Sequence, residues 1–203
     1  KAIVRSQTDS LSSFGKSIER ERLSQIDLKM PFALVISGIR RCGKSTLLRQ
    51  LMEKVKGYYY FNFEDPRAVN FGLEDFQKLD NIFMEEYGKQ DYYFFDEVQN
   101  VWKWELFVRA ILDRNQHVIV TGSNASLLSR ELGAKLTGRH IRYELFPFSF
   151  WEFLRLSDKN PNIDSFQEYF VKGGFPEYLK FNRAEILQEL LNDIVARDIA
   201  VRH

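Results

Sequence analysis

One stretch of eight residues limits the folds open to this chain more than any other part of it. Residues 38–45 read GIRRCGKS and fit the pattern GxxxxGK(S/T). An apolar run, ALVIS, precedes the stretch at residues 33–37, and leucines at helical spacing follow it between Thr46 and Lys56. This order predicts a strand, a glycine-containing loop and a helix, in which inward-facing N–H groups and the helix N-terminus bind phosphate.

The residue types in this loop suit a nucleoside triphosphate. Gly38 and Gly43 let the backbone approach an anion closely, and Lys44 is expected to reach the β and γ phosphates. The Ser45 hydroxyl is short enough to bind Mg²⁺. A strand-to-helix turn that contains lysine by chance is the alternative, and the flanking pattern disfavours it. The residues predicted to line the phosphates are Gly38, Ile39, Arg40, Arg41, Cys42, Gly43, Lys44, Ser45 and Thr46.

Three side chains inside the loop have competing interpretations. Arg40 and Arg41 could contact phosphate, although solvent-facing cations fit these variable positions better. Cys42 has no base placed beside it by the sequence. We therefore interpret it as a small loop filler, sensitive to alkylation, rather than as a nucleophile.

A second chemically informative feature is the acidic pair Asp96 and Glu97, directly after the apolar run YYFF at residues 92–95. Such a run is typical of a central strand covered on both faces. Ligands of open α/β sheets bind beyond the carboxyl ends of the strands, so Asp96 is predicted to hold Mg²⁺. Glu97 is predicted to activate the attacking water as a general base. An acidic strand end without chemistry is the alternative.

Two further candidates lie later in the chain. Ser123 or Asn124, after the apolar run at residues 117–121, could sense the γ phosphate. A turn that caps the next helix is an equally good and compatible interpretation. Arg139 could stabilise the transferred phosphate, within the chain or in a neighbouring molecule, and a surface arginine is the simpler alternative.

The order of apolar runs predicts the fold class. Further β-prone runs lie at residues 58–63, 117–121 and 141–145, and helical patterns separate them. Short strands alternating with helices predict an α/β fold with three layers around a parallel sheet of about five strands.

Beyond Pro147 the pattern becomes helical. Ser149 with Glu152 fits a capping box, and Asp164 or Ser165 is expected to begin another helix. The predicted division is a nucleotide-binding core at residues 1–147 and a small helical lid domain at residues 148–203.

Composition narrows the class of protein. The chain has 203 residues, 29 basic against 28 acidic, and a net charge of +1, so its charge gives no support to a nucleic-acid partner. One cysteine excludes an internal disulfide, and no apolar run approaches the roughly 18 residues of a membrane span. We expect a cytoplasmic protein without a membrane partner. Because the chain starts at Lys1 rather than at a methionine, we expect a trimmed fragment. Because it ends inside a helical pattern, we also expect more protein to follow it in the natural product.

Seven strings occur along the chain in a consistent order. They are GIRRCGKSTLL at 38–48, YFNFEDPR at 60–67, YFFDEVQ at 93–99, VTGSNASLLS at 120–129, LTGR at 136–139, LFPFSFWEFL at 145–154 and GGFPEYL at 173–179. Together they resemble AAA-type ATPases of bacteria and archaea related to the archaeal ATPase group. Members of that family often carry a nuclease-like C-terminal domain.

The resemblance implies an AAA-like five-stranded sheet and ATP as the nucleotide. It places Lys44 and Ser45 in the phosphate-binding motif, Asp96 and Glu97 in the second motif, and the sensor at Ser123 or Asn124. It also implies a turn between lid helices at residues 173–176. The nuclease-like domain is not within these 203 residues.

The leading functional prediction is magnesium-dependent ATP hydrolysis coupled to a conformational change between core and lid. One alternative is a nucleotide-dependent switch with negligible turnover, acting on an unknown protein partner. Another is a DNA-associated motor ATPase, although Arg20, Arg22 and Lys29 are more simply interpreted as a solvated helix face. An oligomer is compatible with each of these predictions.

Overall fold

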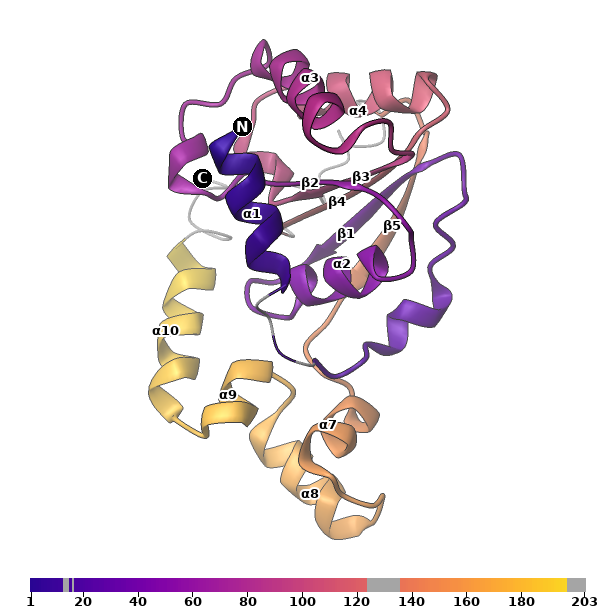
Figure 1. Cartoon of the computed structure of the whole chain (residues 1–203). Coiled ribbons are helices and arrows are strands. Elements are labelled where there is room, and N and C mark those ends of the chain that lie inside the picture. The colour runs from indigo at the N-terminus through magenta and orange to yellow at the C-terminus, as the bar shows by residue number, and fades with distance from the viewer. Residues whose placement is uncertain (13–14, 16, 124–135, 197–203) are drawn as a thin grey trace.

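The computed structural model describes residues 1–12, 15, 17–123 and 136–196, and its centre is a parallel five-stranded sheet (Figure 1). The strand order is β2-β3-β4-β1-β5, and every neighbouring pair is parallel. The predicted α/β fold class is therefore confirmed. The strands are β1 (Ala33–Gly38), β2 (Tyr59–Asn62), β3 (Tyr92–Asp96), β4 (His117–Ser123) and β5 (His140–Leu145).

Helices cover both faces of this sheet. Helix α2 lies on one face, and α3 and α4 lie on the other (Figure 1). These helices are α2 (Lys44–Met52), α3 (Asp75–Tyr87) and α4 (Trp104–Asp113), accompanied by the short 3-10 helices η1 (Glu21–Gln25), η2 (Pro66–Ala68) and η3 (Val98–Asn100).

Alternation along the central strands produces two hydrophobic cores. Leu34 and Ile36 of β1 pack with the α2 leucines, whereas Val35 packs with residues of α3 and α4. All six residues of β1 are buried, as expected of a strand covered on both faces. Burying each large aliphatic side chain contributes about 1.5–3 kcal/mol, so the two cores fix which way β1 faces.

Helix α1 (Ala2–Ser12), which our sequence analysis did not predict, protects the edge strand β2. The Gln7 side-chain amide donates to the carbonyl of Asn62 at 3.1 Å and accepts from the Asn62 N–H at 2.9 Å. The Gln7 amide thus pairs with β2 as a neighbouring strand residue would. Since an unpaired edge invites association with other chains, this contact explains why the helix lies there.

The chain after β5 is helical and extends away from one end of the sheet (Figure 1). The capping box of Ser149 and Glu152 is confirmed at the start of the first of these helices. The prediction that Asp164 or Ser165 begins the next helix is wrong, because Asn162 is the cap and Ser165 is its capping-box partner. The C-terminal helices are α7 (Phe150–Ser157), α8 (Ile163–Lys172), α9 (Pro176–Phe181) and α10 (Ala184–Ile194).

A glycine turn joins α8 to α9, as the family resemblance implied. Gly173 has a φ of +70°, and the Phe148 N–H donates to the carbonyl of Gly174 at 2.7 Å. A Cβ atom on Gly174 would clash with the backbone carbonyl of Phe148. The turn therefore packs directly against the connection between β5 and α7.

Candidate nucleotide-binding site

The loop between β1 and α2 has the backbone that its glycines predict. Gly43 has a φ of +99°, a left-handed conformation that favours glycine, and it precedes the first residue of α2. A Cβ atom on Gly38 would lie 2.8 Å from the Cys42 sulfur and would clash with the Leu145 carbonyl. Gly38 is thus required for close packing against β5, in addition to any approach of an anion.

Lys44 lies over this loop and is only 5% exposed. Its ammonium donates to the carbonyls of Gly38 at 3.2 Å and Ile39 at 3.3 Å. The same nitrogen is 3.5 Å from Glu97 Oε1. The structure therefore brings the loop lysine and the acidic pair together, as the sequence predicted. Ser45 and Thr46 follow Lys44 in the first turn of α2.

Asp96 ends β3 and is 3% exposed. The Thr121 hydroxyl of the neighbouring strand β4 donates to Asp96 Oδ1, and Ser45 hydrogen-bonds the same carboxyl group. Burial raises the pKa of Asp96 above its usual range, and the charge of Glu97 adds to this shift. The hydrogen bonds from Thr121 and Ser45 and the charge of Lys44 lower the pKa of Asp96 and so oppose part of this shift.

Glu97 follows Asp96 in a left-handed backbone conformation, with a φ of +51°. Its N–H donates to Thr121 Oγ1 at 3.0 Å, and its Oε2 accepts from Gln99 Nε2 at 2.6 Å. Thr121 therefore orients both acidic residues, and Gln99 holds the second one. Our sequence analysis gave neither residue a role. The register of β4 beside β3, which is known only from the structure, is what identifies Thr121.

The loop arginines are partly solvent-exposed, as the favoured interpretation has it, but each is also paired with a carboxylate: 34% of the Arg40 side chain and 45% of the Arg41 side chain are exposed. Arg40 is 2.7 Å from Glu64 and 3.9 Å from Asp193 of α10. Arg41 is 2.5 Å from Glu177 of α9. Carboxylates on the C-terminal helices therefore reach across to the phosphate loop.

Cys42 is fully buried, and burial raises the pKa of its thiol. These properties agree with a loop filler. They contradict the expected sensitivity to alkylation, because a buried, protonated thiol is inert.

Three remaining candidates have different outcomes. Ser123 pairs in register with Gly38, so it lies beside the start of the loop. Asn124 lies outside the described residues. The Arg139 carbonyl accepts from the Ala33 N–H, and its guanidinium is 2.5 Å from Asp113. This is the opposite end of β1 from the loop, so the structure does not bring Arg139 to this site, and its action on a neighbouring molecule stays a prediction.

Arg20 is the clearest error of the sequence analysis in this region. We interpreted it as part of a solvated helix face, yet it is 2% exposed. Its guanidinium forms an ion pair with Glu152 of α7 at 2.8 Å. A single basic residue in a polar segment carries no sequence signal of such a long-range partner.

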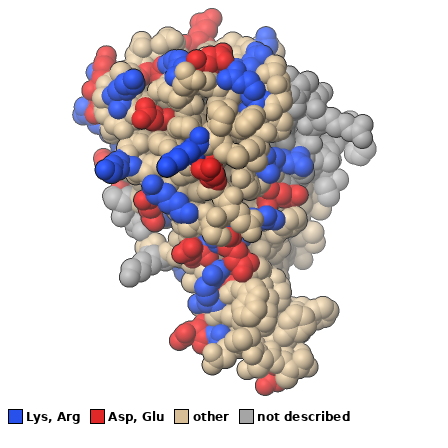
Figure 2. Space-filling model, turned by 90° about the vertical axis from the view of Figure 1, so that its right-hand side faces the viewer, with Lys and Arg blue, Asp and Glu red and all other residues tan. Residues whose placement is uncertain are grey.

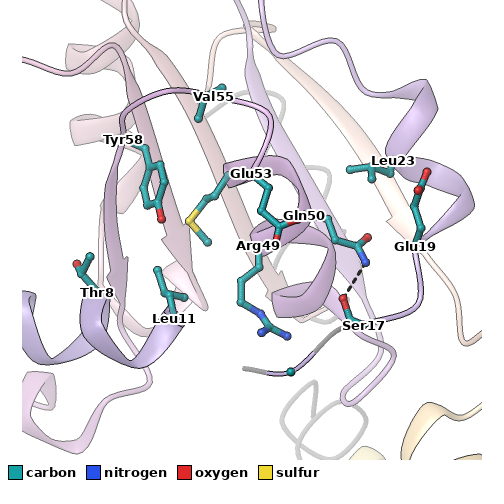
Figure 3. A pocket seen from close by; sticks show the side chains of 12 residues that line it. Thr8, Leu11, Ser17, Glu19, Leu23, Arg49, Gln50, Glu53, Val55 and Tyr58 are labelled. Carbon is teal, nitrogen blue, oxygen red and sulfur yellow. Dashed lines mark hydrogen bonds between the residues drawn. The ribbon is translucent and has the colours of Figure 1, made fainter. Parts of the chain in front are cut away.

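A separate cavity of about 630 Å³ lies along the flank of α2 (Figure 3). Thr8 and Leu11 reach it from α1, and Arg49, Gln50 and Glu53 reach it from α2. None of the predicted phosphate-loop or acidic residues lines it, so it is distinct from the candidate site. The other lining residues are Gly15, Ser17, Glu19, Leu23, Met52, Val55 and Tyr58.

A profile of the AAA domain family matches residues 31–154, more than half of the chain. The chain belongs to the AAA domain family. The matched part of this AAA domain contains the phosphate loop, Asp96, Glu97 and Thr121, whereas α8 to α10 lie beyond it.

Two relatives of this AAA domain are longer proteins described as uncharacterized. One, from Methanocaldococcus jannaschii, is 34% identical over 186 residues, which cover 83% of the chain and 42% of the relative. Another, from Haemophilus influenzae, is 35% identical over 192 residues, which cover 84% of the chain and 47% of the relative. The chain thus spans less than half of the length of these relatives.

Two solved structures with bound nucleotide share the fold of this AAA domain. The AMPPCP-bound DnaA of Aquifex aeolicus superposes with a TM-score of 0.51 at 15% identity, over 100% of this chain and 66% of that one. The Hsp104–ADP complex of S. cerevisiae superposes with a TM-score of 0.52 at 16% identity, over 75% of this chain and 25% of that one. At such identities the likeness concerns the fold. Among the described helices, none has the length and apolar character needed to cross a membrane.

Proposed function

We propose that this AAA domain binds ATP with Mg²⁺ and hydrolyses it. The observation that carries the proposal is the convergence of Lys44 on Glu97 at 3.5 Å, beside a buried Asp96 that Thr121 and Ser45 both contact. These groups come from the loop after β1 and from the ends of β3 and β4. DnaA and Hsp104, which share the fold, carry AMPPCP and ADP in their structures.

The residues present fit Mg²⁺ held partly by the substrate. No cluster of three or more His, Cys, Asp or Glu side chains suitable for a metal occurs in the described part of the chain. Mg²⁺ prefers one or two protein oxygens together with oxygens of phosphate and water. Ser45 and Asp96 would supply the protein oxygens. When bound, the ion would supply positive charge that neutralises the charge developing on the phosphates. A cation there would also favour the ionised form of the buried Asp96 carboxyl.

The chain's own groups then have distinct roles. When the triphosphate binds, the Lys44 ammonium donates to phosphate oxygens in place of the two loop carbonyls. This change also separates the ammonium from the Glu97 carboxylate. Glu97 Oε1 accepts a proton from the attacking water, while Gln99 holds Oε2. The water oxygen bonds to the γ phosphorus, and the bond to the β–γ bridging oxygen breaks, which yields ADP and phosphate. General-base assistance of this kind contributes roughly 10²–10⁴ in rate.

The first prediction separates binding from hydrolysis. Lys44→Ala should abolish binding of the triphosphate, because it removes the ammonium that donates to the Gly38 and Ile39 carbonyls and would bind the β and γ phosphates. Glu97→Gln should retain binding and lose at least about 100-fold of turnover. Equilibrium binding of a fluorescent ATP analogue and release of inorganic phosphate measure the two properties. Equal losses of binding in both variants would contradict the division of roles.

We also propose that residues 148–203 act as a lid whose position depends on the nucleotide. The pairs Arg41–Glu177 and Arg40–Asp193 support this, because phosphate would compete with the carboxylates for the loop arginines. The cellular process that hydrolysis drives, an oligomeric assembly, a cytoplasmic location and the nuclease-like C-terminal domain implied by the resemblance stay predictions.

The two alternative functions make different predictions for the same assay. A switch binds nucleotide but shows no Glu97-dependent phosphate release. A DNA-associated motor is stimulated by added DNA. Figure 2 shows acidic and basic side chains interspersed over the face in view, which does not favour a phosphate-backbone contact there.

A further inference from the structure

The buried guanidinium of Arg20 connects its own segment to the phosphate loop and to residues 146–152, which are far apart in the sequence. Its Nη1 donates to the Cys42 carbonyl at 2.6 Å, inside the phosphate loop. Its Nη2 donates to the Phe146 carbonyl at 2.7 Å, between β5 and α7. Its Nε donates to Glu152 Oε1 at 2.8 Å, on α7. Each nitrogen of the planar group therefore has a different acceptor, which a lysine could not reproduce.

Both partners of this ion pair are themselves fixed. The N–H of Arg20 donates to the Gln50 side chain of α2 at 3.1 Å. Glu152 Oε1 also accepts from the Glu21 N–H at 2.8 Å, and Glu152 Oε2 accepts from the Ser149 N–H at 2.9 Å. The Phe148 ring lies 5.0 Å from the guanidinium carbon. In this buried pair each guanidinium nitrogen has an acceptor, so removing one partner would leave an uncompensated charge.

The contact with Cys42 falls at the turn that the phosphate site requires. A loop that directs its N–H groups inward toward an anion directs carbonyls outward, and a buried carbonyl needs a donor. Arg20 supplies that donor next to Gly43, where an added Cβ atom would lie 2.7 Å from its Nη1. The guanidinium thus packs against the back of the turn that precedes Lys44.

We propose that Arg20 is a positioning residue of the nucleotide site, which couples the phosphate loop to helix α7 through Glu152. The proposal rests on the proposed function, since it assigns Arg20 a part in ATP binding. Movement of α7 displaces Glu152 and Arg20, and with them the Cys42–Gly43 turn. Because such coupling is reciprocal, bound nucleotide also stabilises the position of α7.

The test compares nucleotide affinity in Arg20→Lys, Glu152→Gln and the double variant. Each single change should weaken binding of a fluorescent ATP analogue about 10-fold, and the double variant should be no weaker than the worse single one. The effect should appear in Kd and KM more than in kcat, since Glu97 is untouched.

The matched control is Asp80→Asn, which breaks another ion pair whose carboxylate is buried. Asp80 is 2.6 Å from Arg114, and it accepts from the Tyr93 hydroxyl at 2.7 Å, away from the phosphate loop. This variant should lose thermal stability and keep the wild-type Kd. Arg20 and Glu152 variants whose Kd also stays within about twofold of wild type would overturn the coupling.

A measurement on wild-type protein covers the case in which an Arg20 variant does not fold. Hydrogen exchange of residues 149–157 should slow when ATP analogue is added and should not slow in Glu152→Gln. Unchanged exchange in wild-type protein that binds the analogue would overturn the proposal. Binding without Glu97-dependent turnover would instead contradict hydrolysis and leave this coupling test intact.

Discussion

Single residues of the candidate site place acidic groups where burial makes their ionised form unfavourable. Asp96 is the clearest case, because its carboxyl group is buried, its pKa is raised by that burial, and it lies next to Glu97. The Thr121 hydroxyl offsets part of the cost of burying this carboxyl group, because it donates to Asp96 Oδ1 and accepts from the Glu97 N–H. An acidic side chain that destabilises the protein in the absence of ligand is expected where a cation is to bind.

Asp96→Asn should therefore raise the free energy of unfolding of the nucleotide-free protein at neutral pH, while hydrolysis falls at least about 100-fold. Below pH 3.8, the ordinary pKa of aspartate, wild-type Asp96 is protonated in both states, so the stability difference disappears. The stability difference between the two proteins grows as pH rises from 3.8 toward the folded-state pKa of Asp96, because over this range Asp96 loses its proton in the unfolded chain but keeps it in the folded protein. Urea denaturation of both proteins between pH 3.5 and 8 measures this, and a constant difference would contradict it.

Gln99→Ala should lower kcat about 10-fold with little change in Kd. The Gln99 amide holds one oxygen of Glu97, so its loss leaves the base present but less well oriented. Single-turnover phosphate release measures the effect. A matched control is Gln77→Ala, whose side chain contacts Asn81 on the exposed face of α3. A Gln99 variant that binds and hydrolyses like this control would show that the contact is incidental.

The secondary structure elements show which parts of the fold the sequence can predict. Strands β1 and β3 were predictable because a run of buried residues on both faces has a clear pattern, and α2 because leucines follow a glycine loop. Helix α1 was not, since the contact that attaches it to the sheet edge is a side-chain amide that pairs with the backbone of β2. Local patterns predict burial, whereas pairing with a distant backbone depends on tertiary structure.

Gly174→Ala tests the contact between the α8–α9 turn and the residues before α7. The added methyl group would clash with the Phe148 carbonyl, so the variant should lose about 1–3 kcal/mol of stability. Gly72→Ala is the control, because the nearest atom to its added Cβ is 3.9 Å away. Thermal denaturation compares the two, and equal losses would contradict a specific clash at Gly174.

At the scale of the whole molecule, the catalytic candidates were predictable as types but not as a network. The motif and the acidic pair identified Lys44, Asp96 and Glu97, because their residue types follow strand-like runs at the same sheet edge. Arg20 was missed because its acceptors lie in a loop, a connection and a helix that only the folded chain brings together. Sequence spacing carries no information on such convergence.

The strand order has a mechanical consequence for the C-terminal helices. Gly38, at the start of the phosphate loop, is in register with Leu145, the last residue of β5. Leu145 is therefore fixed in position by the sheet. Helix α7 begins at Phe150. A rotation of the C-terminal helices relative to the sheet would have to occur between Leu145 and Phe150. Within this segment the Phe146 carbonyl accepts a hydrogen bond from Arg20, and the Phe148 N–H donates one to the Gly174 carbonyl. Arg20 therefore contacts the segment about which such a rotation would occur, so a change in its hydrogen bonds would alter the position of α8 as well as that of α7.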